Sequence, residues 1–215
     1  VDADSNTRML GILGGITISK GGAVGGASDV NTYKKHIYSK IGASRINTKY
    51  NLSVSSSSTD YVLSIVIGVG GSKTVALNGS IPVTLIENEI EASIDDDDEE
   101  ITVGSDLLIN ALHNLTLVEY AGSLNASKVA IGAAITTITV TDSLKAYLSG
   151  KNINARSVSV KAVKEDDYNV GSISGGAATT AVIEGAVLTL LVSSKVSATV
   201  GKNSLLNLAG DLNVL

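Results

Sequence analysis

A segment of alternating polar and apolar residues occurs four times in this chain, and this repetition constrains the fold more than any other feature. The four copies begin at His36, Glu89, Ser143 and Lys195, so they lie 53, 54 and 52 residues apart. Each copy precedes a second shared segment that contains an Ile-Asn or Leu-Asn pair. Self-similarity at a fixed period is the signature of architectures in which each unit stacks on the next. The chain is therefore predicted to contain four tandem units.

The second shared segment is aligned on an apolar residue followed by Asn. The four pairs are Ile46-Asn47, Ile109-Asn110, Ile153-Asn154 and Leu206-Asn207. Asn tolerates a left-handed backbone at a turn, and its amide can stack on the Asn of a neighbouring coil. This alignment assigns nine additional residues, 95–103, to the second unit. We therefore predict units of about 53 residues with an acidic insertion at 95–103.

The apolar composition favours β-structure of repetitive cross-section. The chain has no Phe, no Trp, one Met and one Pro, so its apolar mass is Val, Ile, Leu and Ala. A narrow core stacked layer on layer needs only such small and β-branched side chains. Residues 61–67 and 134–140 are examples of β-branched runs with the character of strands. These features predict an all-β fold.

Short strands of this kind can form a sandwich or a barrel as well as a parallel β-helix, or β-solenoid. The similarity between tandem units and the Asn at matching turn positions favour the solenoid. With roughly 20 residues per coil, the chain would make about ten coils. At about 4.8 Å between strands, the predicted rod is on the order of 50 Å long. We expect residues 1–215 to be one segment of a longer repeat array, with the secretion signal outside it.

Charge and composition disfavour several classes of partner. The net charge is −5 and the 16 basic residues form no stripe, so we expect no nucleic-acid partner. The absence of Cys excludes disulfides and thiolate metal sites, and it suits an exported protein. The longest apolar run, around residues 186–192, is too short to cross a bilayer. We therefore predict no membrane-spanning segment.

The most conspicuous charged feature is an unbroken acidic run. It consists of Asp95, Asp96, Asp97, Asp98, Glu99 and Glu100. Carboxylates bind Ca²⁺, which takes about six to eight oxygen ligands. The run lacks the spaced Asp-x-Asp-x-Asp-Gly pattern, and the Gly-Gly-x-Gly-x-Asp nonapeptide occurs nowhere in the chain. The six residues are thus a weak calcium candidate, a solvated loop is the favoured interpretation, and we predict no cofactor.

Two glycine-rich segments resemble functional loops only superficially. In residues 68–74, Ser72 interrupts the Gly-Lys-Thr order of a phosphate loop, and a strand rather than a helix is expected to follow. Residues 171–175 lack the Gly-x-Ser-x-Gly framing of a nucleophile elbow. Glycine-rich segments of this kind are predicted to form tight corners, or flat faces where backbones approach closely.

The two histidines offer little to a catalytic mechanism. His36 and His113 are the only imidazoles that could serve as a base for a Ser nucleophile. Each occupies a repeat position that its sibling units fill with other polar or small residues. Both are therefore predicted to be surface variants.

Paired carboxylates raise the question of glycoside chemistry, which uses two of them. The candidate pairs are Glu87 with Glu89, and Asp166 with Asp167. A carbohydrate-active β-helix enzyme usually lines its groove with aromatic and basic side chains, whereas this chain has no Trp and three Arg. We predict that the chain is not an enzyme.

The repeat units resemble the repetitive passengers of large filamentous adhesins exported by Gram-negative bacteria, and most closely the leukotoxin-type adhesins of fusobacteria. Residues 88–94, 128–134 and 194–201 carry the resemblance, which extends over residues 21–215. It implies type V secretion, a right-handed parallel β-helix, and attachment to host cells, with leukocyte killing in the leukotoxin case. The matching motifs are of low complexity and contain no catalytic residues to carry over.

Together these features predict a secreted or cell-surface protein whose rod attaches to a host-cell surface protein or glycan, on leukocytes among other cells. A cytotoxin segment that acts on leukocyte membranes is the second hypothesis. A carbohydrate-active enzyme is disfavoured, and a spacer that extends a distant tip domain is a further alternative.

Overall fold

The computed structural model describes residues 1–42, 45–202 and 204–215, and among them every side chain except those of residues 96–98. Over these residues the regular structure is β-strand throughout, which confirms the all-β prediction. The strands are β1 (Asp2–Ser19), β2 (Gly22–Gly42), β3 (Ile46–Thr48), β4 (Leu52–Ser72), β5 (Val75–Val103), β6 (Asp106–Ala155), β7 (Ser157–Val200), β8 (Leu205–Leu208) and β9 (Leu212–Val214).

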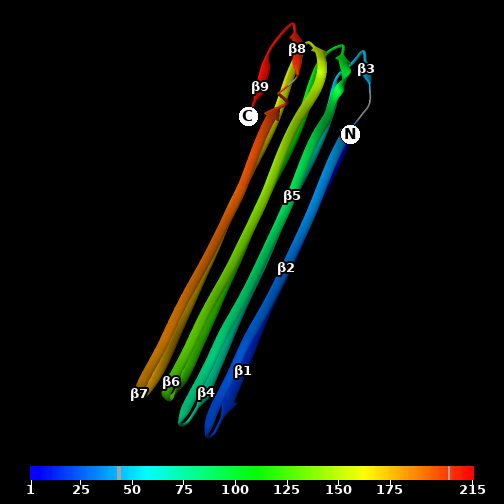
Figure 1. Cartoon of the computed structure of the whole chain (residues 1–215). Coiled ribbons are helices and arrows are strands. Elements are labelled where there is room, and N and C mark those ends of the chain that lie inside the picture. Colours follow the sequence, from blue (N-terminus) through cyan, green and yellow to red (C-terminus); the bar gives the residue numbers. More distant parts are fainter. Residues whose placement is uncertain (43–44, 203) are drawn as a thin grey trace.

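The strands are long because the chain runs back and forth along the whole molecule. β1 leads to the end of the molecule that we call the distal end, turns at residues 20–21, and β2 returns in the opposite direction. The short strand β3 closes the coil at the proximal end, where both termini lie, and β4 then repeats the path of β1 (Figure 1). Each coil thus has two long limbs and one short segment.

Corresponding limbs of successive coils pair in parallel. In the first face, β1 pairs with β4, and β4 pairs with residues 106–126 of β6. These residues of β6 pair in turn with the first part of β7. β2, β5, residues 129–150 of β6 and residues 181–200 of β7 form the second face. The two faces belong to one nine-stranded sheet that folds over on itself in a nearly closed arrangement.

The register confirms the period of the repeat and corrects the number of coils. His36 pairs with Glu89, Glu89 with Ser143, and Ser143 with Lys195, which are the equivalences that the sequence predicts. Each coil therefore takes about 53 residues, and the prediction of about ten coils of 20 residues is wrong. The long axis of the molecule follows the strands and not the direction in which the coils stack (Figure 1).

The second predicted alignment is wrong in one of its four units. Ile46 pairs with Ile101, Ile101 with Ile153, and Ile153 with Leu206, so the second coil contributes Ile101-Thr102 and not Ile109-Asn110. The predicted nine-residue insertion disappears with this correction. Asp96 pairs with Gly150 and Glu100 with Asn152, so three residues of the second coil stand opposite one of the third. The second coil is longer by two residues here, at the proximal turn.

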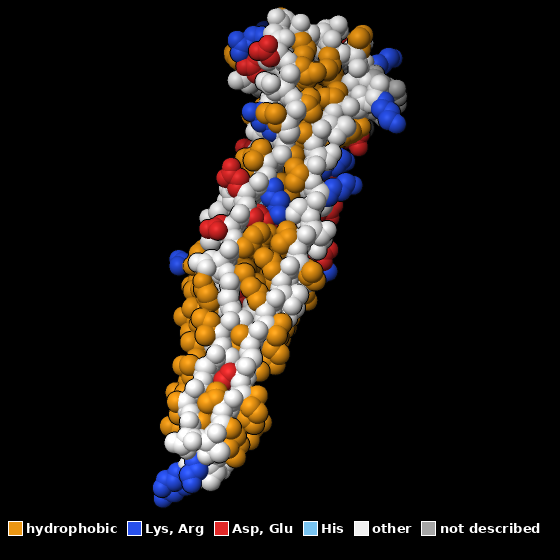
Figure 2. Space-filling model, turned by 90° about the vertical axis from the view of Figure 1, so that its left-hand side faces the viewer, with side chains coloured by type: hydrophobic (Ala, Val, Ile, Leu, Met, Phe, Trp, Pro, Cys, Tyr) orange, Lys and Arg blue, Asp and Glu red, His pale blue; other side chains and the backbone are white. Residues whose placement is uncertain are grey.

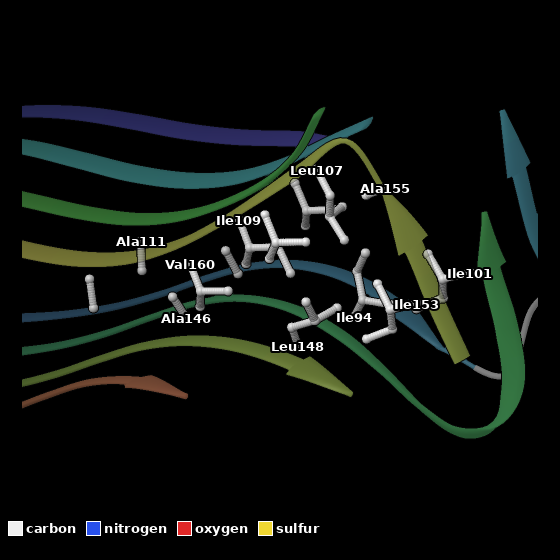
Figure 3. Packing of buried hydrophobic residues seen from close by; sticks show 14 of the residues in the cluster. Ile94, Ile101, Leu107, Ile109, Ala111, Ala146, Leu148, Ile153, Ala155 and Val160 are labelled. Carbon is white, nitrogen blue, oxygen red and sulfur yellow. The ribbon is translucent and has the colours of Figure 1, made fainter. Parts of the chain in front are cut away.

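Apolar side chains from both faces fill the proximal part of the interior. The larger hydrophobic cluster includes Ile94, Ile101, Ile109, Leu148 and Ile153, all fully buried. They converge on the space between the two faces (Figure 3). Alternate residues of each limb point inward, as the pleat of a strand requires, and their partners one coil away continue the same column. A second, smaller cluster around Val62, Leu117 and Ile138 lies nearer the distal end.

Polar contacts between coils add to the register. The side-chain amide of Asn207 donates to Oδ1 of Asn154 at 3.0 Å, as expected for Asn stacked at equivalent turns. On the outer side of the second face, basic side chains of the first coil meet carboxylates of the second. These contacts are Lys34 with Glu87 (2.6 Å), His36 with Glu89 (3.0 Å) and Lys40 with Glu91 (3.1 Å). A shift of one coil by one residue would break the ladder and exchange inward for outward positions.

Candidate functional site

The distal half of the molecule exposes aliphatic side chains on both outer faces. We define it as residues 10–32, 63–86, 118–141 and 170–193, one range from each coil. On the first face the exposed fraction is 74% for Ile12 and 65% for Ile173. The remaining exposed aliphatic side chains of this half include Leu10, Ile16, Ile18 and Leu124 on the first face, and Val24, Val30, Ile81, Ile183, Val187 and Leu191 on the second.

These aliphatic side chains lie on both flanks of the molecule. The view onto the edge of the last coil shows hydrophobic atoms down both sides of the distal half, whereas most Lys, Arg, Asp and Glu side chains gather at the other end (Figure 2). Ile67 and Ile173 flank a shallow apolar hollow over Gly122 on the first face. Large contiguous apolar surfaces are uncommon on soluble proteins and mark contact with a protein or a membrane.

The charged residues of the distal half are confined to two kinds of position. Lys20, Lys73 and Lys128 occupy or border the turns at the distal end. The three carboxylates, those of Asp29, Glu119 and Glu184, occupy inward-facing positions of their limbs. Within these four ranges the outward-facing positions of both faces thus carry no charge.

The distal half therefore departs from ordinary strand patterning, although Ile86, Ile138 and Val140 of the smaller hydrophobic cluster also lie at its inward positions. Its inward positions hold many small or polar residues, among them Gly68, Asn78, Ser123 and Asn125, and its outward positions hold aliphatic ones. A bare Cβ at Gly68 would lie 2.7 Å from Oδ1 of Asn78, so the two faces approach too closely there for a larger residue. The small inward residues therefore allow the faces to meet, and the aliphatic residues remain outside.

Hydrogen bonds satisfy two of the inward carboxylates but not the third. Ser64 donates to Asp29 at 2.8 Å, and Asn125 donates to Glu184 at 3.3 Å. Glu119 is fully buried, and among the described residues no group lies within ordinary hydrogen-bonding geometry of its two oxygens. Burial raises the pKa of Glu119 to about 7; the nearby Thr84 hydroxyl offsets part of this rise, and the charge of Asp29 adds to it.

A boundary of charged and aromatic groups separates the distal half from the rest. On the first face the Arg8 guanidinium lies 5.5 Å from the centre of the Tyr61 ring. On the second face Lys34 pairs with Glu87. Arg8 and Lys34 lie about equally far along the chain from the distal turn at residues 20–21, so the boundary is at a similar level on both faces.

A second candidate is a layer of ionisable side chains buried between the two hydrophobic clusters. We call it the buried polar layer. It contains three carboxylates, two ammonium groups and one imidazole, each contributed by an inward position of a limb. The six residues are Lys35, Asp60, His113, Asp142, Lys164 and Asp166.

Asp60 is the centre of one side of this layer. Its carboxylate accepts hydrogen bonds from Lys35 (2.5 Å), Tyr33 (3.0 Å) and Ser58 (2.9 Å), and faces Nε2 of His113 at 3.3 Å. Burial alone would raise the pKa of Asp60, but the hydrogen bonds from His113, Lys35 and Ser58 outweigh it and hold the pKa below its ordinary value.

Lys164 links the two carboxylates on the other side. Its ammonium group lies 2.9 Å from Asp142 and also contacts Asp166. Burial lowers the pKa of Lys164, yet the hydrogen bonds to Asp166 and Asp142 raise it above its ordinary value. Nδ1 of His113 faces Asp166 at 3.7 Å and Asp142 at 4.0 Å.

His113, Asp142 and Asp166 are the residues of this layer that could coordinate a cation, because one ligand atom of each lies within 4.8 Å of the others. The ammonium group of Lys164 already pairs with both carboxylates, however, and would repel a divalent ion placed beside it. The arrangement therefore fits a structural ion-pair network better than a metal centre.

The two histidines differ in their environments. His36 is exposed, as predicted, and pairs with Glu89. The prediction for His113 is wrong, because its side chain is fully buried in the polar layer. Its equivalents one coil away, Ser58 and Lys164, are also inward. The alternation of inward and outward residues in the neighbouring units could therefore have predicted an inward position for His113.

The other candidates from the sequence do not combine into a site among the described side chains. Asp95, Glu99 and Glu100 are exposed, whereas the side chains of Asp96, Asp97 and Asp98 lie outside the described residues, so the calcium candidate stays a prediction.

The two carboxylate pairs have different geometries. Glu87 and Glu89 are both outward, and each contacts a basic side chain of the first coil. Asp166 and Asp167 point to opposite sides of β7, because consecutive residues of a strand do so.

The glycine-rich segments lie in strands and at the distal turns. Residues 68–72 end β4, and β5 begins at Val75, so a strand follows as predicted. Residues 171–175 lie within β7.

No protein family, curated protein or solved structure matches this chain. Among the described residues, no helix is long and apolar enough to cross a membrane.

Proposed function

We propose that this chain is a segment of a right-handed parallel β-helix from an exported bacterial surface protein, and that it serves as a non-catalytic module for attachment to host cells. Parallel pairing of each limb with the limb one coil further along supports the β-helix. Connections between parallel strands of one sheet are almost always right-handed, which supports the handedness. The resemblance to filamentous adhesins supports export and a place on the cell surface.

The observation that carries the attachment role is the uncharged aliphatic surface on both outer faces of the distal half. Side chains such as Ile12 and Ile173 would lose contact with water if a partner covered them, and burial of apolar area stabilises a complex by about 25 cal/mol per Å² before the costs of association. Because successive coils repeat the same surface, many weak contacts would act together and raise the overall affinity. The proposed partner is the surface of host cells, including leukocytes.

A cytotoxin segment that acts on leukocyte membranes is the second candidate. The same surface favours it, because both faces are apolar and lysines occupy the distal turns.

Binding of the fluorescently labelled protein to neutrophils and epithelial cells, measured by flow cytometry with a viability dye, tests these proposals. Saturable binding without dye uptake supports attachment, and dose-dependent dye uptake supports the toxin. No binding by folded, monomeric protein contradicts both.

A pair of matched variants shows whether the distal half is responsible. Ile67→Glu with Ile173→Glu places two charges at outward positions of the second and fourth coils in the distal half. Thr59→Glu with Val163→Glu places two charges on the same face of the same coils, nearer the proximal end. Attachment through the distal half requires that only the first pair reduces cell binding.

A further inference from the structure

The aliphatic outward side of the distal half indicates the environment that this surface fits. In water, a strand buries its apolar side and exposes its polar side, whereas here Asp29, Glu119 and Glu184 face inward and the outward side is aliphatic. Strands in contact with lipid show the same arrangement, with apolar residues outside and polar residues inside.

We propose that the distal half enters the hydrocarbon layer of a lipid bilayer, tip first, as far as the boundary at Arg8 and Lys34. This inference rests on the proposed attachment function and names the lipid itself as the partner. Residues 9–19 separate Arg8 from the distal turn and residues 22–33 separate the turn from Lys34. At about 3.3 Å per residue these stretches extend over about 36–40 Å. The hydrocarbon core of a bilayer is about 30 Å thick, so the uncharged surface is long enough to cross it.

The basic residues at the tip fit the anionic headgroups of phospholipids. Lys20 and Lys73 occupy equivalent turns of adjacent coils, because Ser19 pairs with Ser72 and Gly22 with Val75. Lys128 lies at the corresponding turn of the third coil. Parallel stacking spaces these turns by about 4.8 Å, so the three ammonium groups repel one another unless anions lie between them. Phosphate headgroups supply such anions.

The distribution of the apolar surface argues against a second copy of the chain as its partner. A second copy packed face to face would cover one face and leave the other exposed, whereas both faces of the distal half are aliphatic (Figure 2). A bilayer surrounds both faces at once. The open edges of the first and last coils oppose entry, because unpaired backbone groups cost several kcal/mol each in hydrocarbon. Entry therefore requires these edges to pair with neighbouring copies.

Flotation with protein-free vesicles of phosphatidylcholine, with and without phosphatidylserine, tests this proposal. We expect the protein to float with both kinds of vesicle, and more strongly with the anionic one. Ile67→Glu with Ile173→Glu should reduce the partition coefficient about tenfold or more, while Thr59→Glu with Val163→Glu should leave it within about twofold. Replacement of Lys20, Lys73 and Lys128 by Gln should abolish only the preference for phosphatidylserine.

Depth is measured with a single environment-sensitive label, which the absence of natural Cys allows. A label on Ile67→Cys should shift to the blue in vesicles and be quenched by lipid-borne quenchers, and a label on Ser57→Cys should not. Failure of folded, monomeric protein to float, or equal quenching at both sites, overturns the proposal. So does self-association without lipid that buries residue 67. Binding to cells without binding to vesicles would refute lipid entry while leaving attachment through a protein or glycan intact.

Discussion

Replacing Asp60 with Asn would remove one negative charge from the buried polar layer with almost no change in side-chain size. Asp60 accepts hydrogen bonds from Lys35, Tyr33 and Ser58 in the wild type, and Lys35 is only 9% exposed. The amide oxygen of Asn can keep one or two of these bonds. The ammonium group of Lys35 would lose its only carboxylate partner within 4.0 Å among the described residues.

The magnitude follows from the burial of Lys35. Removing one partner of a buried ion pair costs about 3–5 kcal/mol, because the remaining charge is neither hydrated nor compensated. The slight exposure of Lys35 and the retained amide contacts place the expected loss near about 3 kcal/mol. Small domains have a free energy of unfolding of about 5–15 kcal/mol, so this is a large share of the total.

The free energy of unfolding is measured by urea denaturation at neutral pH, followed by far-UV circular dichroism. Glu87→Gln is the matched control, because Glu87 pairs with Lys34, the neighbour of Lys35, but on the exposed outer face. Exposed pairs contribute about 0–1 kcal/mol. A loss below about 1 kcal/mol for Asp60→Asn, or an equal loss for both variants, would refute the assignment of Asp60 as the partner that compensates Lys35.

Three further outcomes are expected. The pKa of Glu119 rises from 4.5 to about 7 in the fold, so the free energy of unfolding of the wild type should fall by up to about 3 kcal/mol between these pH values. Urea titrations at pH 5 and pH 8 should show this fall for the wild type and not for Glu119→Gln. A parallel fall in both proteins would contradict the prediction. Ile109→Ala, in the larger cluster, should cost about 2–5 kcal/mol, against less than about 1 kcal/mol for Ile12→Ala at an exposed position. Asn154→Ala removes the acceptor of the 3.0 Å bond from Asn207 and should cost about 1 kcal/mol, measured by the same denaturation, and no loss would indicate that this bond is not needed.

The period of the repeat could be predicted because the four shared segments obey ordinary strand patterning. Their inward positions are apolar except for Ser39 and their outward positions are mostly polar, so the segments from His36, Glu89, Ser143 and Lys195 align residue by residue. The length of the limbs could not be predicted for a related reason. In the distal half many inward positions are Gly, Ser and Asn, residues that usually mark turns, so each limb of about 20 residues resembles several short strands.

The buried polar layer was missed because a charged residue in a strand is usually exposed. The sequence does place Lys35, Asp60, His113, Asp142 and Asp166 at inward positions, but this is evident only once the direction of each limb is known. The direction of each limb depends on which residues form the distal turns, and several glycine-rich segments could form them. Pairing between coils, which joins residues more than 50 apart, decides among them.

The constancy of the register along each limb determines where this chain can change its length. We call the difference in residue number between two paired residues the offset. It is 53 from Asp2 with Ser55 to the end of β1. It is 55 along β4 (Leu52 with Leu107) and 51 along the first limb of β7 (Asp106 with Ser157). Every change of offset falls at a proximal or distal turn. One residue deleted within a limb would exchange inward for outward side chains up to the next turn, which would bring aliphatic residues into the narrow distal interior and carboxylates onto its surface. Insertions and deletions among related chains should therefore gather at the two ends, with the limbs between them free of gaps.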